Sequence, residues 1–163
     1  MLDYLGSRLQ CDGDEKADVQ HRMNIAQAVF SSFFHLWKDD RLPLSMKLRL
    51  YQTAVCSTFS HACEAWDLTD DVRRMINGFN SRCLHIITGK NYRETATNPA
   101  VDLLLLLRKR RLRYLGHILR LDENRLLRRT FFAYIHGGQI VPPSSLLMDC
   151  QHLQFDDVTE LAS

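Results

Sequence analysis

Apolar residues recur every three or four positions along three successive stretches of this chain, which is the spacing of one face of an α-helix. The stretches cover residues 14–37, 45–67 and 70–87. Their apolar stripes are formed by Val19, Met23, Ala26, Phe30, Phe33 and Trp37; by Leu48, Tyr51, Val55, Phe59, Ala62 and Trp66; and by Val72, Met75, Ile76, Phe79, Cys83, Ile86 and Ile87. Such helices must bury their stripes against one another, so the sequence predicts an all-α bundle of four to five helices.

Residues between the stripes are of the kinds that begin and end helices. Ser45 follows Pro43 and is suited to cap the second helix, and Thr69 or Asp70 is suited to cap the third. Gly89 is well placed to end the third helix, because glycine readily adopts the left-handed conformation of that position.

Two further helical segments and two less regular ends complete the prediction. We expect a fourth helix from Pro99 to about Leu121 and a last helical piece from Glu123 to Ile135. At the start, residues 4–9 before a turn at Asp12-Gly13 predict a short strand-like remnant. Residues 137–163, with a double glycine, a double proline and several acids, predict a loosely ordered tail.

Positive charge is concentrated in the middle of the chain. Residues 68–138 carry 14 Lys and Arg against 6 Asp and Glu, whereas residues 139–163 carry four acids and no Lys or Arg. A basic block of this kind favours anionic partners, nucleic acid first.

The fourth helix has two faces of opposite character. Its basic face holds the candidate nucleic-acid-binding residues Lys109, Arg110, Arg113, His117 and Arg120. Its apolar face holds Leu112, Leu115, Ile118 and Leu119. Guanidinium groups bind phosphate and stay charged at cellular pH, so this basic face can follow a nucleic-acid backbone. The alternative is a solvated helix face that pairs with acids elsewhere.

Two arginines do not fit this division. Arg108 and Arg111 fall towards the apolar side of the same helix. We expect them to lie at helix edges, to pair with acids, or to mark a bend.

No catalytic or metal motif is evident. The sequence has no Gly-x-Ser-x-Gly elbow, no His-Glu-x-x-His pair and no phosphate-binding glycine loop, so we expect neither catalytic residues nor a cofactor. His61, Cys63 and Glu64 are close in sequence but lack the spacing of a structural zinc site, and no metal is expected. Trp37 and Trp66 could stack on bases, but both end apolar stripes, which favours packing in the core.

The cysteines and hydropathy indicate the compartment. The five cysteines are odd in number and scattered, which favours reduced thiols and an intracellular location, in the nucleus or cytoplasm. The longest purely apolar run, Leu103 to Leu107, is far too short to span a bilayer, and the N-terminus is not of the secretory type, so no membrane association is expected.

Several short sequence segments, taken in order along the chain, resemble one family, the reverse transcriptases of non-LTR (LINE-type) retrotransposons. They are Tyr4-Leu5-Gly6-Ser7 with Asp12-Gly13, the helix from Asp18 to Trp37, Leu48-Arg49-Leu50-Tyr51, Glu64-Ala65-Trp66-Asp67-Leu68-Thr69, Arg82-Cys83-Leu84, and Arg110-Arg111-Leu112-Arg113-Tyr114-Leu115-Gly116-His117-Ile118-Leu119-Arg120. Their order and approximate spacing match the family across residues 4–129.

The resemblance implies a division of the chain. Residues 1–13 would be an end-of-palm strand and turn, 14–67 thumb-like helices, 68–136 a basic post-thumb region, and 137–163 an acidic tail. The catalytic aromatic-x-Asp-Asp box of these enzymes belongs upstream of the Tyr-Leu-Gly phrase, so we expect a catalytically incomplete fragment that at most binds RNA, DNA or a hybrid duplex.

The chain departs from the family in several places. Ser60 to Trp66 lacks the usual Tyr-Gly of Tyr-Gly-x-Glu-x-Trp, the segment from Asn98 to Arg110 is about ten residues short, and residues 131–163 match nothing in the family. Two other interpretations stay open. One is a helical protein-interaction module that binds a partner, or a second copy, through an exposed leucine-rich face at Leu103 to Leu107; the other is a non-functional remnant.

Overall fold

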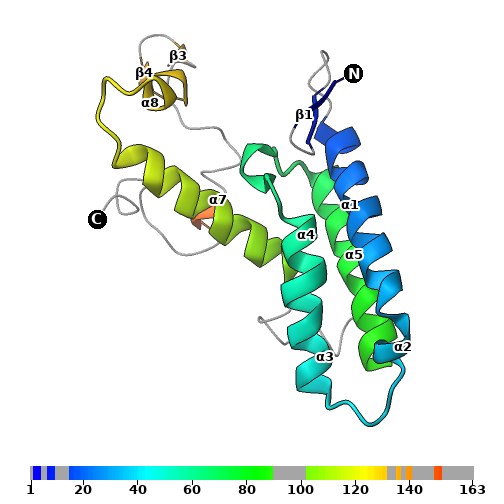
Figure 1. The fold of residues 1–163 in the computed structure, drawn as a ribbon. Helices are drawn as coiled ribbons and strands as arrows, with labels where there is room; N and C mark the ends of the chain where they lie inside the picture. The colour runs from blue at the N-terminus through cyan, green and yellow to red at the C-terminus, as the bar shows by residue number, and fades with distance from the viewer. Residues whose placement is uncertain are drawn as a thin grey trace. The chain divides into compact units, whose positions relative to one another are not determined.

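The structure, a computed structural model, describes residues 2–4, 7–9, 15–89, 102–131, 135–136, 139–140 and 149–151. The chain divides into two compact units, Met1–Leu107 and Arg108–Ser163. Most of the described residues are helical, so the predicted all-α class is confirmed (Figure 1). The division at residues 13, 67 and 136, drawn from the resemblance, remains a prediction.

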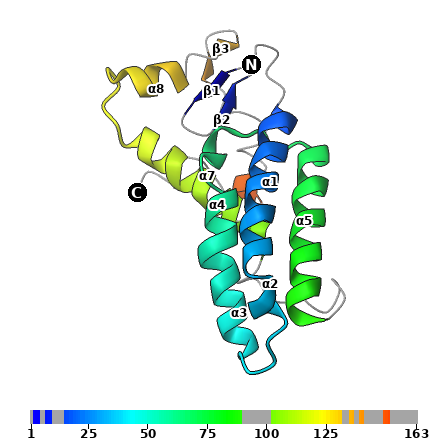
Figure 2. The same cartoon turned by 45° about the vertical axis from the view of Figure 1, so that its right-hand side comes forward.

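Three helical rods form the first unit. They are α1 (Glu15–Ser32), the consecutive segments α3 (Leu44–Leu50), η1 (Tyr51–Cys56) and α4 (Ser57–Phe59), and α5 (Asp70–Thr88). In both views each rod lies beside the other two (Figures 1 and 2). The three rods correspond to the three apolar stretches, because each buries its stripe against the others.

Aromatic side chains fill the centre of this bundle. Phe30 stacks on Trp37 with ring centroids 5.1 Å apart, and Phe59 stacks on Phe79 at 5.7 Å. These rings are almost completely buried, as is Trp66, whose ring meets Phe59 edge to face. Such pairs contribute about 0.5–1.5 kcal/mol each beyond the burial of their area. The interpretation of the two tryptophans as core residues is confirmed.

The first predicted helix is interrupted near its end. It was expected to run unbroken to Trp37, but α1 stops at Ser32 and a separate short helix, α2 (Phe34–Trp37), follows. The Trp37 indole donates a hydrogen bond of 2.8 Å to the Phe30 carbonyl, and the Ser32 hydroxyl donates one of 2.7 Å to the Val29 carbonyl. These side chains take carbonyl groups that the helical ladder would otherwise use, which explains the break.

The second predicted helix is also not continuous. A π-helical turn, η1, follows α3, α4 ends at Phe59, and a 3-10 turn, η2 (Cys63–Ala65), comes only after Ala62 in the left-handed conformation at φ 60°. The hydroxyls of Thr53 and Thr58 donate back to backbone carbonyls one turn earlier, which weakens regular helix in this region. The prediction of one helix to Asp67 was therefore wrong beyond Phe59.

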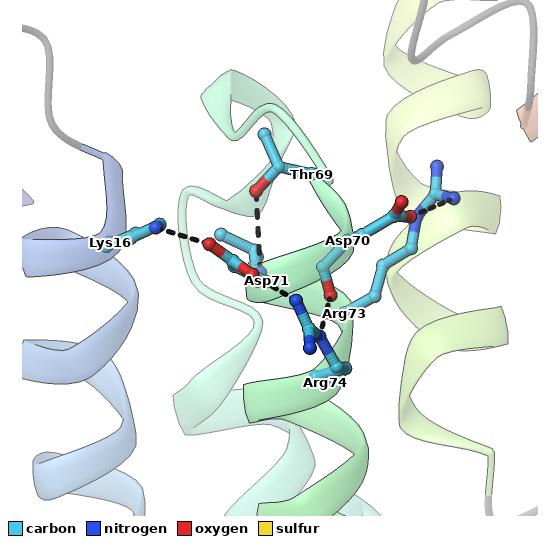
Figure 3. A network of polar contacts seen from close by, with 7 residues as sticks. Lys16, Thr69, Asp70, Asp71, Arg73 and Arg74 are labelled. Atoms are coloured by element: carbon cyan, nitrogen blue, oxygen red, sulfur yellow. Dashed lines mark hydrogen bonds and ion pairs between the residues drawn. The ribbon is translucent and has the colours of Figure 1, made fainter.

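Helix α5 begins and ends where the sequence predicts. The Thr69 side chain accepts a hydrogen bond from the Val72 amide, and Gly89 at φ 67° donates its amide to the His85 carbonyl. Asp71 in the first turn accepts a 2.6 Å hydrogen bond from Lys16 of α1 and also pairs with Arg74, so the pKa of Asp71 is lowered, chiefly by Lys16 (Figure 3). These exposed pairs stabilise the helix start only slightly.

Two short strands precede α1. β1 (Leu2–Tyr4) pairs antiparallel with β2 (Ser7–Leu9), with Tyr4 opposite Ser7. The predicted N-terminal remnant is thus a hairpin of two strands rather than one strand.

The second unit is built around the larger part of α7 (Leu103–Leu119), which begins in the first unit after its N-cap, Asp102. It also contains α8 (Leu126–Phe131), an antiparallel pair of strands, β3 (Ile135–His136) and β4 (Gln139–Ile140), and helical residues at 149–151. The helical piece predicted from Glu123 to Ile135 begins later, at Leu126, because Asp122 first closes a turn by accepting from the Asn124 and Arg125 amides. Its predicted last residue, Ile135, lies in β3, and residues 132–134 lie outside the described residues.

No helix among the described residues is long and apolar enough to cross a membrane.

Candidate nucleic-acid interface

Four of the five candidate binding residues lie on α7, and the fifth, Arg120, follows directly after its last residue, Leu119; all five belong to the second unit. Four of them, Lys109, Arg113, His117 and Arg120, are exposed, and Arg110 is half-buried. The opposite face is closed, since Leu112, Leu115 and Ile118 are at most 3% exposed. The two-faced helix predicted from the sequence is therefore present, with the basic face towards solvent.

The exposed basic residues follow one line along α7, which we call the basic column: Lys109, Arg113, His117 and Arg120. Their spacings of four, four and three keep them on one side of the helix. With a rise of about 1.5 Å per residue, the column is roughly 16 Å long. This length allows contact with several consecutive phosphates of one nucleic-acid strand.

Arg108 and Arg111 have a different role from the basic column. The Arg108 Nε lies 3.3 Å from Asp149 Oδ1, and the Arg111 Nη1 donates a 2.5 Å hydrogen bond to Asp149 Oδ2. Asp149 is fully buried and Arg111 is 3% exposed. Of the three expectations for these arginines, pairing with an acid is the one observed. Their partner lies 38 residues beyond Arg111 along the chain, in the segment predicted to be a loosely ordered tail, and no local pattern identifies it.

Arg128 closes the end of α7. Its Nη1 donates to the carbonyls of Leu119 at 3.1 Å and Leu121 at 2.6 Å, and its Nη2 lies 3.6 Å from Glu123. A cation at the carboxyl end of a helix also meets the negative end of the helix dipole. The neighbouring Arg125 and Arg129 are exposed and extend the basic surface of this unit, although they were not among the predicted site residues.

The leucine run is not an exposed face. Leu103, Leu104 and Leu107 are 1%, 8% and 0% exposed and belong to the core of the first unit, and Leu105 and Leu106 are half-buried. The prediction that this run offers a surface for a partner or a second copy was wrong, because the run supplies apolar side chains that the three rods bury.

Two of the residues considered for a metal site, His61 and Cys63, make other contacts in the structure. Cys63 is buried in the core, whereas the exposed His61 accepts a hydrogen bond at Nδ1 from Arg22 at 3.1 Å. Within the described ranges, no group of three or more His, Cys, Asp or Glu is placed to hold a metal ion.

A small polar cluster lies in the otherwise apolar core of the first unit. Tyr51 donates a 2.8 Å hydrogen bond to Asn80 Oδ1, and Cys56 and Cys83 lie beside the same hydroxyl. Burial raises the pKa of both thiols to about 12 and raises that of Tyr51 well above its usual value. Groups held neutral in this way are unsuited to nucleophilic chemistry, and the four cysteines that the structure describes are buried thiols outside any disulfide.

Comparison with known proteins gives no match to this chain among protein families, curated proteins or solved structures.

Proposed function

We propose that this chain is a catalytically incomplete relative of the thumb and post-thumb region of non-LTR retrotransposon reverse transcriptases, and that it binds nucleic acid through the basic column of α7. The observation that carries the proposal is the separation of charge on this helix. Lys109, Arg113, His117 and Arg120 face solvent, while the apolar side is buried.

The chemistry of the column favours the phosphate backbone as the ligand. Lysine and arginine bind phosphate oxygens of any sequence, and neither Asn nor Gln, which read adenine, occurs in the column. The proposed activity is therefore sequence-independent binding of a duplex, either DNA or an RNA–DNA hybrid. The sequence segments that resemble those of the reverse transcriptases favour an RNA–DNA hybrid or a template–primer duplex as the ligand.

Salt dependence gives the sharpest test. Three residues of the basic column, Lys109, Arg113 and Arg120, and the neighbouring Arg110 carry a positive charge, so a phosphate contact from each gives a slope of log K against log salt of about −3.6, at about −0.9 per phosphate. Affinity for a labelled duplex should fall about 150-fold between 50 and 200 mM salt, measured by fluorescence anisotropy. Affinity that does not depend on salt, or no binding at 50 mM, would contradict the proposal.

A matched pair of triple variants separates the effect of the column and its neighbour Arg110 from the effect of overall charge. Replacing Arg110, Arg113 and Arg120 by Gln should flatten the slope to about −0.9. Replacing three exposed arginines of the first unit, Arg41, Arg49 and Arg82, by Gln changes the net charge equally and should leave the slope unchanged. Equal losses in the two variants would show that the column is not the site.

The proposed origin and the lack of catalysis have their own tests. Genomic DNA upstream of the Met1 codon should carry an open or decayed frame that encodes an aromatic-x-Asp-Asp hairpin. Purified protein given an RNA template, an annealed primer, deoxynucleotides and Mg²⁺ should not extend the primer. Primer extension would refute the view that the chain is catalytically incomplete.

A further inference from the structure

The arginines of α7 fall into two groups with different surroundings. The basic column faces solvent, whereas Arg108 and Arg111 converge on the single carboxylate of Asp149. On a helical wheel with 100° per residue, Arg108 and Arg111 lie on the other side of α7 from the column. All of these residues belong to the second unit.

The contact has the chemistry of an anion site. Arg111 donates a hydrogen bond to one oxygen of the carboxylate, and the Arg108 Nε lies 3.3 Å from the other in an ion pair without hydrogen-bond geometry. Two guanidinium groups thus face one carboxylate, as arginine pairs face a phosphate group. The carboxylate is not part of α7 but comes from residues 139–163, which carry four acids and no Lys or Arg. An acidic segment thus supplies the anion that this pair of arginines holds.

We infer that Arg108 and Arg111 form a second phosphate-binding pair on α7, which Asp149 occupies in the ligand-free protein and which nucleic-acid phosphate takes over when residues 149–151 leave. The inference rests on the proposed binding of nucleic acid and adds to it a control by the chain's own acidic segment. Asp149 competes with phosphate, so the apparent affinity of the native protein is reduced by the fraction of molecules in which the pair is closed.

Amide hydrogen exchange of the unmodified protein tests this without any substitution. Asp149 and Cys150 are 0% and 3% exposed, so their amides should exchange slowly in the free protein. Addition of a 20-base-pair duplex at 50 mM salt should speed their exchange severalfold, because phosphate replaces the carboxylate. Unchanged or slower exchange in the bound state would overturn the inference.

Asp149→Asn tests the same competition through affinity. The variant removes the negative charge that competes with phosphate for the two arginines, so it should bind duplex more tightly at low salt, with a slope steeper by about 1.8 for two added phosphates. It should accordingly lose about twelvefold more affinity than the native protein between 50 and 200 mM salt. Glu123→Gln removes one acid of the same unit that is 86% exposed, and its slope should stay native. An unchanged slope in a folded Asp149→Asn variant would refute the competition.

The outcomes separate this inference from the proposed function. If the native protein binds duplex but neither the exchange nor the slope changes, Asp149 only holds the second unit together and the inference fails alone. If only Asp149→Asn binds, the second pair is real and the basic column is not sufficient. If neither protein binds, both ideas are overturned. Should the variant not fold, the exchange experiment on the native protein decides.

Discussion

The hydrogen bond between Tyr51 and Asn80 offers a quantitative test of how the first unit is held together. Tyr51 opens the π-helical turn η1, and its hydroxyl donates to Asn80 Oδ1 of α5 over 2.8 Å. Tyr51 is fully buried and Asn80 is 5% exposed, so neither group can exchange this contact for water. Tyr51→Phe removes the hydroxyl and little else, which makes it the perturbation of choice.

The expected cost follows from the burial of both partners. A neutral hydrogen bond contributes about 0.5–1.5 kcal/mol net, and a buried acceptor that loses its donor adds to this, so Tyr51→Phe should lower the free energy of unfolding by about 1–2 kcal/mol. For a unit of roughly 100 residues, this corresponds to a fall in the melting temperature on the order of 5–10 °C.

Tryptophan fluorescence during urea unfolding is a suitable assay. Both tryptophans of the chain, Trp37 and Trp66, are buried in the first unit, so their emission reports on that unit alone. A double-mutant cycle with Asn80→Ala isolates the pair, and the two substitutions should couple by about 1 kcal/mol. A loss below about 0.5 kcal/mol for Tyr51→Phe, or a coupling energy near zero, would refute the reasoning.

Four further outcomes are expected. Cys56 and Cys83, whose pKa burial raises to about 12, should resist iodoacetamide at pH 8 in the folded protein; rapid labelling would contradict their burial. A raised thiol pKa favours the folded state only while the thiol is neutral. The contribution of Cys56 and Cys83 to the free energy of unfolding should therefore be complete below pH 9 and disappear as the pH rises towards 12. Replacement of both cysteines by Ala should remove this pH dependence. Leu107→Ala should cost about 2–5 kcal/mol in urea unfolding, since the side chain is fully buried, and a loss under about 1 kcal/mol would place it outside the core. Gly89→Ala should cost about 1–2 kcal/mol, because φ 67° forces an L-residue into the left-handed region, and an unchanged unfolding midpoint would argue against that conformation.

The local sequence pattern was sufficient to predict most helices and buried residues of the first unit. The three apolar stripes depend on the helical period alone, and most of their residues are buried as expected. Thr69 and Gly89 bound α5 because capping uses backbone groups within one turn. The predicted helix bounds were wrong where a side chain donates a hydrogen bond to a backbone carbonyl of the helix, as Trp37 does to Phe30 at the end of α1.

The candidate site divides in the same way. The sequence by itself determined that α7 has a basic and an apolar face, since this follows from a period of 3.6 residues, and it marked Arg108 and Arg111 as misfits that need a partner. Only the tertiary structure decided that the partner is Asp149 and that the leucine run belongs to the core. The physical reason is that a buried charge must be paired and an apolar surface must be covered, but the chain can meet either need from any distance along the sequence.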